Sequence, residues 1–395
     1  MKYLEILFWI LVFIVFYAYI GYGILLIFLV KIKSIFVKDK NLYTKDYEPE
    51  VTLLIAAFNE KDYVAAKVRN SLQLDYPKNK LHLVWVTDGS DDGTPELLGN
   101  YPEVTVYHES ARNGKIGAIN RAMKFVNTPI VVYSDANTML GEDAIRRIIY
   151  LFSNSEIGCV SGEKRIASKD VDTASGAGEG IYWKYESLLK RYDFKLYSVV
   201  GAAGELFAIR KELHQDVERD TILDDFIISL RIAMKGYKIG YDPDAYAIES
   251  ASANVKEELK RKIRIAAGGI QSIVRLKGLL NPFKYRTLTF QYISHRVLRW
   301  TLAPLSMILI FIINAFFVFN KGVDCSNFYT LLICLQLLFY FSALLGWFLQ
   351  NREIKVKLLF IPYYFFIMNY AVVLGFFRYI KRNQSVNWER AKRAN

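Results

Sequence analysis

The sequence predicts an α/β protein with a doubly wound mixed sheet, mostly parallel, framed by transmembrane and interfacial α-helices. Of its 395 residues, 53% are hydrophobic and 23% are charged, which is too apolar for an ordinary soluble enzyme and too charged for a pure membrane bundle. The charged residues concentrate between about residue 31 and residue 300, so we expect a soluble domain between membrane segments. Inside that block, short apolar runs alternate with helical patterns, which is typical of parallel sheets.

The chain starts with an apolar run from Leu4 to Val30, which has no small-residue cleavage site and is long enough to cross a bilayer. We therefore expect a transmembrane helix in residues 1–30 and a polar linker in residues 31–50. Lys31 and Lys33 follow the run, and by the positive-inside rule they place the next domain in the cytoplasm, at the cell membrane.

The net charge of +12 is compatible with nucleic acid, anionic lipid or a phosphorylated substrate as a partner. No nucleic-acid-binding motif stands out, whereas basic residues cluster beside the apolar segments, so we expect a lipid bilayer and no nucleic acid. Cys159, Cys325 and Cys334 show neither metal-ligand spacing nor a disulfide framework, which predicts a reducing compartment. The histidines show no ligand spacing, and no role is assigned to them.

The first half of the soluble domain contains four expected strands. They are Val51–Ala56, Leu81–Val86, Val104–His108 and Ile130–Ser134, with helices expected at Lys61–Gln73 and over residues 112–125. In doubly wound sheets, ligands bind at the carboxyl ends of the strands. Polar side chains gather at those ends, namely Asn59, Glu60, Asp88, Asp135 and Asn137. Because a turn explanation would have to be repeated at each loop, this shared placement indicates a site.

The run Val131–Asn137 predicts a buried strand that delivers Asp135 and Asn137 to its exposed carboxyl end. Carboxylate and amide oxygens there can bind Mg²⁺ or Mn²⁺, with a diphosphate completing the coordination shell. The alternative for this motif alone is a strand followed by an Asx turn.

The second half of the domain, to about residue 280, continues the alternation. The expected elements are a strand at Ile157–Arg165, an aromatic amphipathic helix at Glu179–Phe194, a helix at Phe226–Lys235, a strand within Tyr237–Glu249 and a basic helix at Lys256–Arg275. The aromatic helix either lies at the membrane surface or packs beneath the catalytic face. Asp224 and Asp225 stand just before the third of these elements, where they either act in catalysis or cap the helix.

Residues 281–300 are amphipathic and basic, which predicts a helix lying in the membrane interface. Residues 301–380 contain three apolar stretches, at about Leu302–Phe319, Phe328–Leu349 and Leu358–Tyr379, and residues 381–395 form a basic tail. Three crossings would place that basic tail outside the cell, against the positive-inside rule. We therefore hypothesise that the third stretch, which Pro362 and Asn369 interrupt, is re-entrant or interfacial.

These parts suit attack on a nucleotide diphosphate sugar. Lys115 lies in a glycine turn at a helix start, where backbone donors and positive charge favour a phosphate. A divalent cation and nearby basic residues would stabilise the leaving diphosphate, and a carboxylate would take the proton from the attacking hydroxyl.

The motifs resemble those of membrane-bound family 2 inverting glycosyltransferases, in their order along the chain. They are Asn59-Glu60, Thr87-Asp88-Gly89-Ser90-Asp91-Asp92-Gly93-Thr94, Gly114-Lys115, Ser134-Asp135-Ala136-Asn137 and Leu223-Asp224-Asp225. The resemblance covers nearly the whole chain and implies a GT-A fold over residues 51–280. The membrane frame is similar to that of the processive branch, which includes cellulose, hyaluronan and poly-N-acetylglucosamine synthases.

The resemblance also implies roles for individual residues. Nucleotide-sugar binding falls to Asn59, Glu60, Asp88, Lys115, Asp135, Arg264 and Arg261, metal binding to Asp135 and Asn137, base catalysis to Asp225 with Asp224, and acceptor contacts to Gly204 and Glu205. The main departure is in the Gln-x-x-Arg-Trp motif, where Arg261 replaces glutamine and Ile265 replaces the tryptophan under the acceptor sugar. Trp183 is a candidate substitute. The similar run Arg296–Trp300 lies at a membrane boundary, so we interpret it as an interfacial anchor.

Three functions remain open on this basis. The first is an inverting hexosyl- or N-acetylhexosaminyltransferase that extends a polysaccharide from a UDP-sugar and couples synthesis to export, alone, as a homo-oligomer or with an export partner. The second is a non-processive transferase that adds one sugar to a lipid-linked or other membrane acceptor. The third is a non-enzymatic scaffold or transporter with a degenerate transferase domain, against which the intact acidic set argues.

Overall fold

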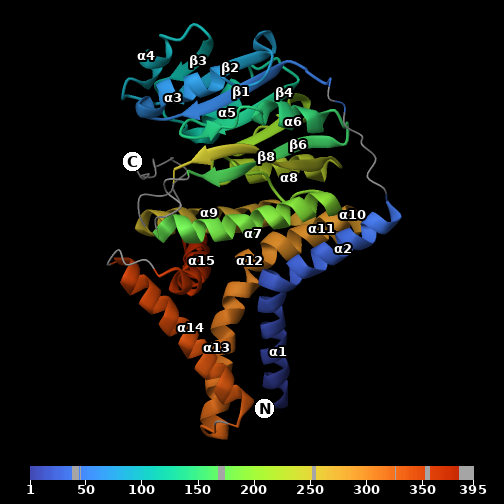
Figure 1. Cartoon of the computed structure of the whole chain (residues 1–395), viewed down its shortest axis with the longest axis vertical. Coiled ribbons are helices and arrows are strands. Elements are labelled where there is room, and N and C mark those ends of the chain that lie inside the picture. The colour runs from blue at the N-terminus through green and yellow to red at the C-terminus, as the bar shows by residue number, and fades with distance from the viewer. Residues whose placement is uncertain are drawn as a thin grey trace.

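The computed structural model describes residues 1–37, 44, 46–167, 174–250, 255–324, 326–351 and 356–381. These residues form three tiers: a sheet domain, a layer of helices lying across its lower side, and helices that project away from that layer (Figure 1). Cys325 and nearly all of the predicted basic tail lie outside the described residues.

In the described part of the chain, eight strands form one mixed sheet in the order β3-β2-β1-β4-β7-β6-β8-β5. Their bounds are β1 Val51–Ala57, β2 Leu81–Asp88, β3 Val104–Glu109, β4 Ile130–Asp135, β5 Met139–Leu140, β6 Ile157–Ile166, β7 Leu206–Arg210 and β8 Lys238–Glu249. Strand β1 pairs in parallel with β2 and β4, β2 with β3, and β6 with β8. The predicted mixed, mostly parallel α/β sheet is confirmed. The sequence did not indicate the short β5 or the antiparallel β7, which inserts between β4 and β6.

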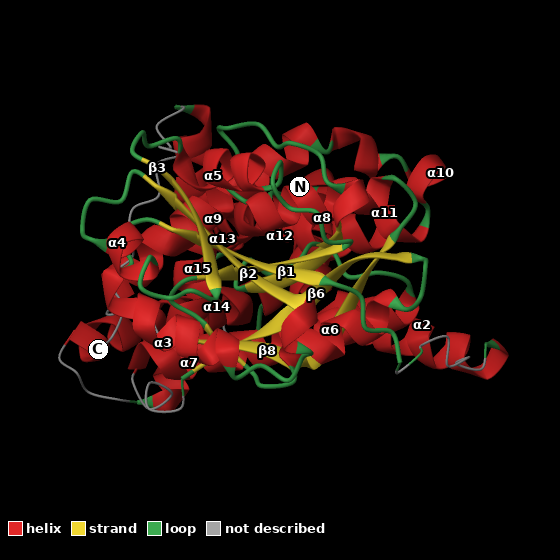
Figure 2. Ribbon diagram, turned by 90° about the horizontal axis from the view of Figure 1, so that it is seen from above, coloured by secondary structure: helices red, strands yellow, loops and turns green. Residues whose placement is uncertain are grey.

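Helices cover both faces of this sheet, and Figure 2 shows the strands running between them. The helices are α3 Lys61–Leu72, α4 Thr94–Leu98, α5 Gly114–Ala122, α6 Ala144–Phe152 and α8 Asp224–Met234. Helices α3 and α6 contribute to one core and α5 and α8 to the other. All seven residues of β1 are buried, because both of its faces are covered. This arrangement brings the carboxyl ends of β1, β2 and β4 to one edge.

Beneath the sheet lies a layer of helices that we call the platform. It consists of α7 Ala174–Leu196, α9 Val255–Arg275, α10 Pro282–Tyr285, α11 Thr287–Tyr292, a π-helical turn Ile293–Val297 and α12 Leu298–Trp300. The single amphipathic helix predicted for residues 281–300 is therefore wrong in detail. Arg286, with a φ of 45°, separates α10 from α11, and Thr301 ends α12 in a non-helical conformation. The aromatic helix α7 packs beneath the sheet, which was one of its two predicted positions.

The N-terminal helix, Lys2–Phe36, divides at a π-helical turn into α1 Lys2–Phe16 and α2 Tyr22–Phe36. Figure 1 shows α1 extending away from the sheet beside α13, Leu302–Lys321, whereas α2 bends to lie against the platform. Tyr22 and Leu26 of α2 pack on Leu189 of α7. Only the first part of the predicted transmembrane helix thus points away from the sheet domain.

The described residues include four helices that are long and apolar enough to cross a membrane: Lys2–Phe36, Leu302–Asn320, Phe328–Gln350 and Leu358–Ile380. The last two belong to α14, Phe328–Asn351, and α15, Lys357–Ile380. Helix α15 runs through Pro362 and packs against α9 of the platform. Whether α15 spans the bilayer or lies in its interface stays a prediction.

Gly375 lies where α15 passes close to α9. A Cβ atom there would come within 2.6 Å of Ala266 Cβ and 2.9 Å of the Ala267 nitrogen. We therefore expect Gly375→Ala to force the helices apart and to lower the free energy of unfolding by roughly 1–3 kcal/mol, measured by thermal unfolding in detergent. Gly278→Ala is the control, because its methyl group would meet Met234 Cε at 3.4 Å. Equal melting temperatures for the two variants would contradict this packing.

Candidate active site

A cavity of about 550 Å³ lies between the carboxyl edge of the sheet, the platform and α15. It collects almost all the predicted site residues, although they come from distant parts of the sequence. Those on its wall are Glu60, Lys115, Asp135, Asn137, Trp183, Gly204, Glu205, Asp224, Asp225, Arg261 and Arg264. Of the predicted residues, Asn59 and Asp88 are not on that wall.

Lys115 links the two acidic clusters of this cavity. Its Nζ lies 2.9 Å from Asp135 Oδ1 at the end of β4 and 3.5 Å from Asp224 Oδ2 at the start of α8. Although burial alone would lower the pKa of Lys115, Asp135 and Asp224 raise it. The lysine is therefore a fixed positive charge at the carboxyl edge of the sheet.

Asp225 lies on the cavity wall in the first turn of α8. Burial and the negative charge of neighbouring Asp224 raise its pKa to about 7, while Lys115 opposes this shift. A Cβ atom on Gly204 would lie 3.3 Å from Asp225 Oδ2, so the glycine leaves the carboxylate open. A carboxyl group poised near neutral pH can accept a proton from a hydroxyl group.

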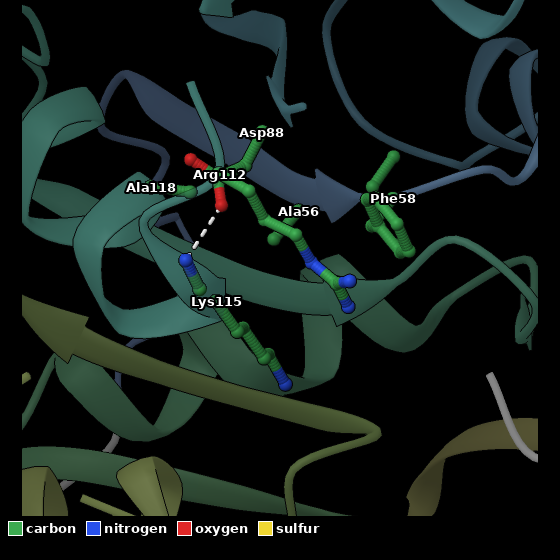
Figure 3. A pocket seen from close by; sticks show the side chains of 8 residues that line it. Ala56, Phe58, Asp88, Arg112, Lys115 and Ala118 are labelled. Atoms are coloured by element: carbon green, nitrogen blue, oxygen red, sulfur yellow. Dashed lines mark hydrogen bonds between the residues drawn. The ribbon is translucent and has the colours of Figure 1, made fainter. Parts of the chain in front are cut away.

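A smaller pocket adjoins the cavity at the ends of β1 and β2 (Figure 3). Asp88 and Phe58 line it, and the Arg112 guanidinium stacks over the Phe58 ring with its Cζ 3.8 Å from the centroid. Asp88 Oδ2 accepts hydrogen bonds from the backbone of Asn113 (2.9 Å) and Gly114 (2.6 Å). Gly114 has a φ of 80°, which glycine adopts without strain, and the turn so formed presents Lys115. Lys115 lines both the pocket and the cavity.

Asn59, which was predicted to bind the nucleotide sugar, is hydrogen-bonded within the protein to Asp91. Its Nδ2 donates to Asp91 Oδ1 at 2.8 Å, and its Oδ1 accepts from the Asp91 backbone at 3.0 Å. Asn59 has a left-handed φ of 53°, which asparagine tolerates well for a residue with a side chain. The residue ties the loop after β1 to the loop after β2, and it lines neither the pocket nor the cavity.

Lys164 of β6 forms an ion pair with Glu205, one of the two predicted acceptor-contact residues. Its side chain is 1% exposed, and its Nζ lies 2.9 Å from Glu205 Oε1 and also contacts Glu249 of β8. This ion pair lowers the pKa of Glu205. Asn137 Nδ2 donates a long hydrogen bond of 3.5 Å to Glu249 Oε1, so the asparagine lies beside the same acidic group.

A family model described as "Glycosyltransferase like family 2" matches residues 49–268, which is more than half of the chain. The chain belongs to this glycosyltransferase family. Among its relatives is a poly-beta-1,6-N-acetyl-D-glucosamine synthase of Staphylococcus aureus, 28% identical over 235 residues, which are 57% of this chain and 56% of the relative. A beta-monoglucosyldiacylglycerol synthase of Synechocystis sp. is 29% identical over 237 residues, or 56% of this chain and 48% of the relative. The chain thus matches about half the length of these curated relatives.

A similar solved structure is a mannosyltransferase from Pyrobaculum calidifontis in complex with GDP-Man and Mn²⁺. Its TM-score is 0.69 at 22% identity, and the match covers 96% of this chain and 100% of that one. This likeness shows the fold of the glycosyltransferase. The predicted GT-A fold is confirmed.

The donor atoms around Asp135 fit a divalent cation. Burial raises the pKa of Asp135, Lys115 opposes this shift, and the nearby carboxylates of Glu205 and Glu249 add to it. Asn137 adds an amide at the same strand end, and both residues line the cavity. The described residues contain no cluster of three or more His, Cys, Asp or Glu side chains suited to a metal. A cation here would therefore need ligands from outside the protein, as a diphosphate provides.

Sequence reasoning misplaced the run Arg296–Trp300 of the glycosyltransferase. Arg296 and Trp300 line the active-site cavity rather than serving only as an interfacial anchor. The Trp300 ring meets Phe226, the residue after Asp225, edge-on at 5.2 Å between centroids. A tryptophan from another element thus lines the same cavity as Ile265. The spacing of the run Arg296–Trp300 could be read from the sequence, but the chain path that places it at the cavity could not.

Sequence reasoning also missed a buried charge network in the platform. His295, which is fully buried, lies 2.6 Å from Asp193 Oδ2 and 3.2 Å from Glu186 Oε2. Glu186 also accepts from Arg296 Nη1 at 3.0 Å and Arg299 Nη1 at 2.6 Å, and these cations hold its pKa well below the usual range. Arg299 Nε donates to the Ala18 carbonyl at 2.9 Å, within the π-helical turn of the N-terminal helix. The network connects that turn to the cavity wall.

Because the pKa of Asp225 is raised, we expect this residue to make the free energy of unfolding depend on pH. A carboxyl group whose pKa is higher in the folded than in the unfolded protein destabilises the fold once the pH exceeds the unfolded value, increasingly up to the folded value. Asp225→Asn should therefore raise the melting temperature more at pH 8 than at pH 4.5, with a gain on the order of 2 kcal/mol at pH 8. Thermal unfolding at the two pH values tests this, and a pH-independent effect would contradict the buried, repelled carboxylate.

Proposed function

We propose that this glycosyltransferase moves a sugar from a nucleoside diphosphate sugar to a hydroxyl group of a membrane-associated acceptor, with inversion at the anomeric carbon. The observation that carries this proposal is the position of Lys115. It borders both the small pocket and the large cavity, where a diphosphate joining a nucleoside to a sugar would have to lie. Asp225 lies on the wall of the large cavity, where the sugar would be.

The donor in this proposal is a UDP-sugar. Asp88 and Phe58, with Glu60 at the cavity side, would contact the uridine; the small pocket that they line is only about 10 Å³ and would have to open to admit the base. Lys115 would neutralise the diphosphate together with Arg264, which is exposed to the cavity and interacts electrostatically with Asp224, Asp135 and Asp225. Arg261 is already engaged, because its guanidinium makes two hydrogen bonds to Glu258, at 2.9 and 3.0 Å.

The reaction would be a single displacement. The acceptor oxygen bonds to the anomeric carbon, the bond from that carbon to the diphosphate breaks, and the hydroxyl proton passes to the Asp225 carboxylate. The open space beside Gly204 gives the acceptor access to this carboxylate. Asp224 keeps the pKa of Asp225 high enough for it to accept the proton, and one displacement inverts the configuration.

Asp135 and Asn137 would hold Mg²⁺ or Mn²⁺, which would supply Lewis-acid stabilisation of the leaving diphosphate. Support comes from the negative charge of Glu205 and Glu249 near Asp135, where Lys115 Nζ, 2.9 Å from Asp135 Oδ1, would share the carboxylate with the cation. The mannosyltransferase with the same fold was solved with Mn²⁺. We propose that the catalytic domain lies in the cytoplasm at the cell membrane, because Lys31 and Lys33 follow the first apolar run.

The acceptor distinguishes two versions of this function. Met368 and Val372 of the apolar helix α15 line the cavity, which supports addition of one sugar to a lipid-linked acceptor. The Staphylococcus aureus relative, named a poly-beta-1,6-N-acetyl-D-glucosamine synthase, supports extension of a polysaccharide, for which a second copy or an export partner would complete the path across the membrane. The apolar wall that α15 gives the cavity favours the lipid-linked acceptor.

Asp225→Asn should reduce transfer by at least about 1,000-fold while donor binding persists, because only the proton acceptor is lost. Turnover with radiolabelled UDP-sugars and calorimetric titration with UDP and Mn²⁺ measure the two effects. Asp220→Asn is the matched control, since Asp220 is exposed and pairs with Arg275. Full activity of Asp225→Asn would contradict the role of Asp225.

Asp224→Asn should shift the acidic limb of the rate profile to lower pH by roughly one unit. Wild-type kcat/KM is expected to rise with pH through about 7, as Asp225 loses its proton. Removing the negative charge of Asp224 makes that loss easier. The profile of kcat/KM between pH 5 and 9 measures the shift, and an acidic limb unchanged from wild type would contradict the coupling between these carboxylates.

Product length separates the two acceptor versions. Purified enzyme in bilayer nanodiscs, given a panel of radiolabelled nucleotide sugars and membrane lipid extract, should yield a lipid-extractable product carrying one added sugar. Chromatography after lipid extraction measures this. A long, water-soluble polymer would contradict single addition and support the polysaccharide version.

A further inference from the structure

One face of α7 lines the cavity on the side away from the nucleoside pocket. Trp183, Glu186 and Lys190 stand three and four residues apart, so their side chains share that face. Glu186 belongs to the charge network of the platform. Lys190 has no role in the fold or in the reaction described above.

Lys190 is a buried ammonium group that lacks a counterion among the described residues. The residue is 3% exposed, and its Nζ has no hydrogen-bond partner. Its nearest described partners are aromatic rings, with Nζ 5.7 Å from the Trp183 centroid and 5.6 Å from that of Tyr241. A buried charge without a partner is unfavourable, so such a group points to an anionic ligand.

The neighbouring carboxylates are engaged with other groups. Glu186 pairs with Arg296 and Arg299, and Glu205 pairs with Lys164. Glu163, on strand β6 against which α7 packs, accepts hydrogen bonds from the hydroxyls of Ser187 and Tyr241. These contacts leave the positive charge of Lys190 uncompensated.

Two other ammonium groups face the same indole ring. Lys164 Nζ lies 5.4 Å and Lys262 Nζ 5.9 Å from the Trp183 centroid. Lys262 also lies 5.8 Å from the Tyr364 ring of α15 and 3.5 Å from Glu258. Lysine side chains around Trp183 therefore reach from the sheet to α15, and of these Lys164 and Lys262 are paired with carboxylates whereas Lys190, among the described residues, is not.

This cluster belongs to the acceptor side of the cavity. Contacts lead from Asp225 to Gly204, from adjacent Glu205 to Lys164, and from Lys164 to Trp183. On its other side, Lys262 reaches α15, whose Met368 and Val372 give the cavity an apolar wall. The donor diphosphate has its own cation in Lys115, beside the nucleoside pocket.

We propose that Lys190, with Trp183 and Lys262, binds the phosphate group of a lipid-anchored acceptor. The phosphate lies against Lys190 and Lys262, the lipid chain lies along α15, and the acceptor hydroxyl reaches Asp225. This inference rests on the proposed function in taking the acceptor to be membrane-associated. The attacking group remains a hydroxyl, because Asp225 is suited to remove its proton.

The experiment measures binding by thermal unfolding of the full-length chain in neutral detergent. Three probes are titrated: dihexanoylphosphatidate, which joins a lipid to a phosphate, dihexanoylglycerol, which lacks the phosphate, and inorganic phosphate. Only dihexanoylphosphatidate should stabilise the wild type strongly. Lys190→Met should weaken its apparent affinity roughly 10- to 100-fold, as loss of a charged hydrogen bond does, while Lys190→Arg retains most of it.

Lys184→Met is the matched control, because Lys184 is an exposed lysine on the same helix, and it should bind like the wild type. Lys190→Gln and Lys262→Met provide further variants should Lys190→Met fail to fold. Equal affinity in Lys190→Met and Lys184→Met would overturn the proposal. Equal stabilisation by inorganic phosphate would make this a free-phosphate site, and equal stabilisation by dihexanoylglycerol would make it a site for the lipid chain alone; either result overturns it.

Asp225→Asn separates this inference from the proposed function. It should bind dihexanoylphosphatidate as the wild type does, because Asp225 contacts the hydroxyl and not the phosphate. Loss of transfer with retained phosphatidate binding supports both claims. Retained transfer in Asp225→Asn refutes the base while leaving the phosphate site to its own test.

Discussion

The ion pairs of Lys115 with Asp135 and Asp224 are the interaction on which the site depends. They join the end of β4 to the start of α8, two elements about ninety residues apart in sequence. Without the lysine, four carboxylates around the cavity, those of Asp135, Asp224, Asp225 and Glu205, would repel one another in a poorly solvated space. Asp88 fixes the glycine turn that presents this lysine. The strand-end carboxylates therefore have structural as well as chemical reasons to be present.

A second constraint comes from the membrane. The cavity has a floor made of platform helices, and the network around Glu186 fastens that floor to the π-helical turn between α1 and α2. Buried ion pairs of this kind contribute little net stability, but removing one partner is strongly destabilising. Arg296 takes part in the network and also lines the cavity. The orientation of the membrane helices and the shape of the active site are thus coupled through one set of side chains.

The edge of the sheet could be predicted from sequence because it follows from a simple rule. Parallel strands expose their carboxyl ends together, so Glu60, Asp135 and Asn137 had to meet near Lys115. Asn59 follows the same rule, but its amide is hydrogen-bonded to Asp91 of the next loop, and its role in donor binding stays a prediction. The antiparallel β7, Leu206–Arg210, was missed because a run of five residues is too short to give a clear periodic signal.

The platform could not be predicted in the same way. Its helices pack through contacts between distant segments, such as Trp300 against Phe226 and Lys262 against Trp183 and Tyr364. The breaks at Arg286 and Thr301, which turn residues 281–300 back towards the cavity, leave no periodic signal in the sequence. From the sequence alone, Lys190 would likewise be predicted to be an exposed lysine on a helix, whereas it is buried.

The most direct test of the account is a cryo-electron microscopy structure with a non-hydrolysable phosphonate analogue of the UDP-sugar and Mn²⁺. We expect the uracil beside Asp88 and Phe58, the diphosphate analogue on Lys115 and Arg264 with the metal at Asp135, and the anomeric carbon facing Asp225. A donor bound with its diphosphate on Lys190 and Lys262, away from Lys115, would contradict the central assignment.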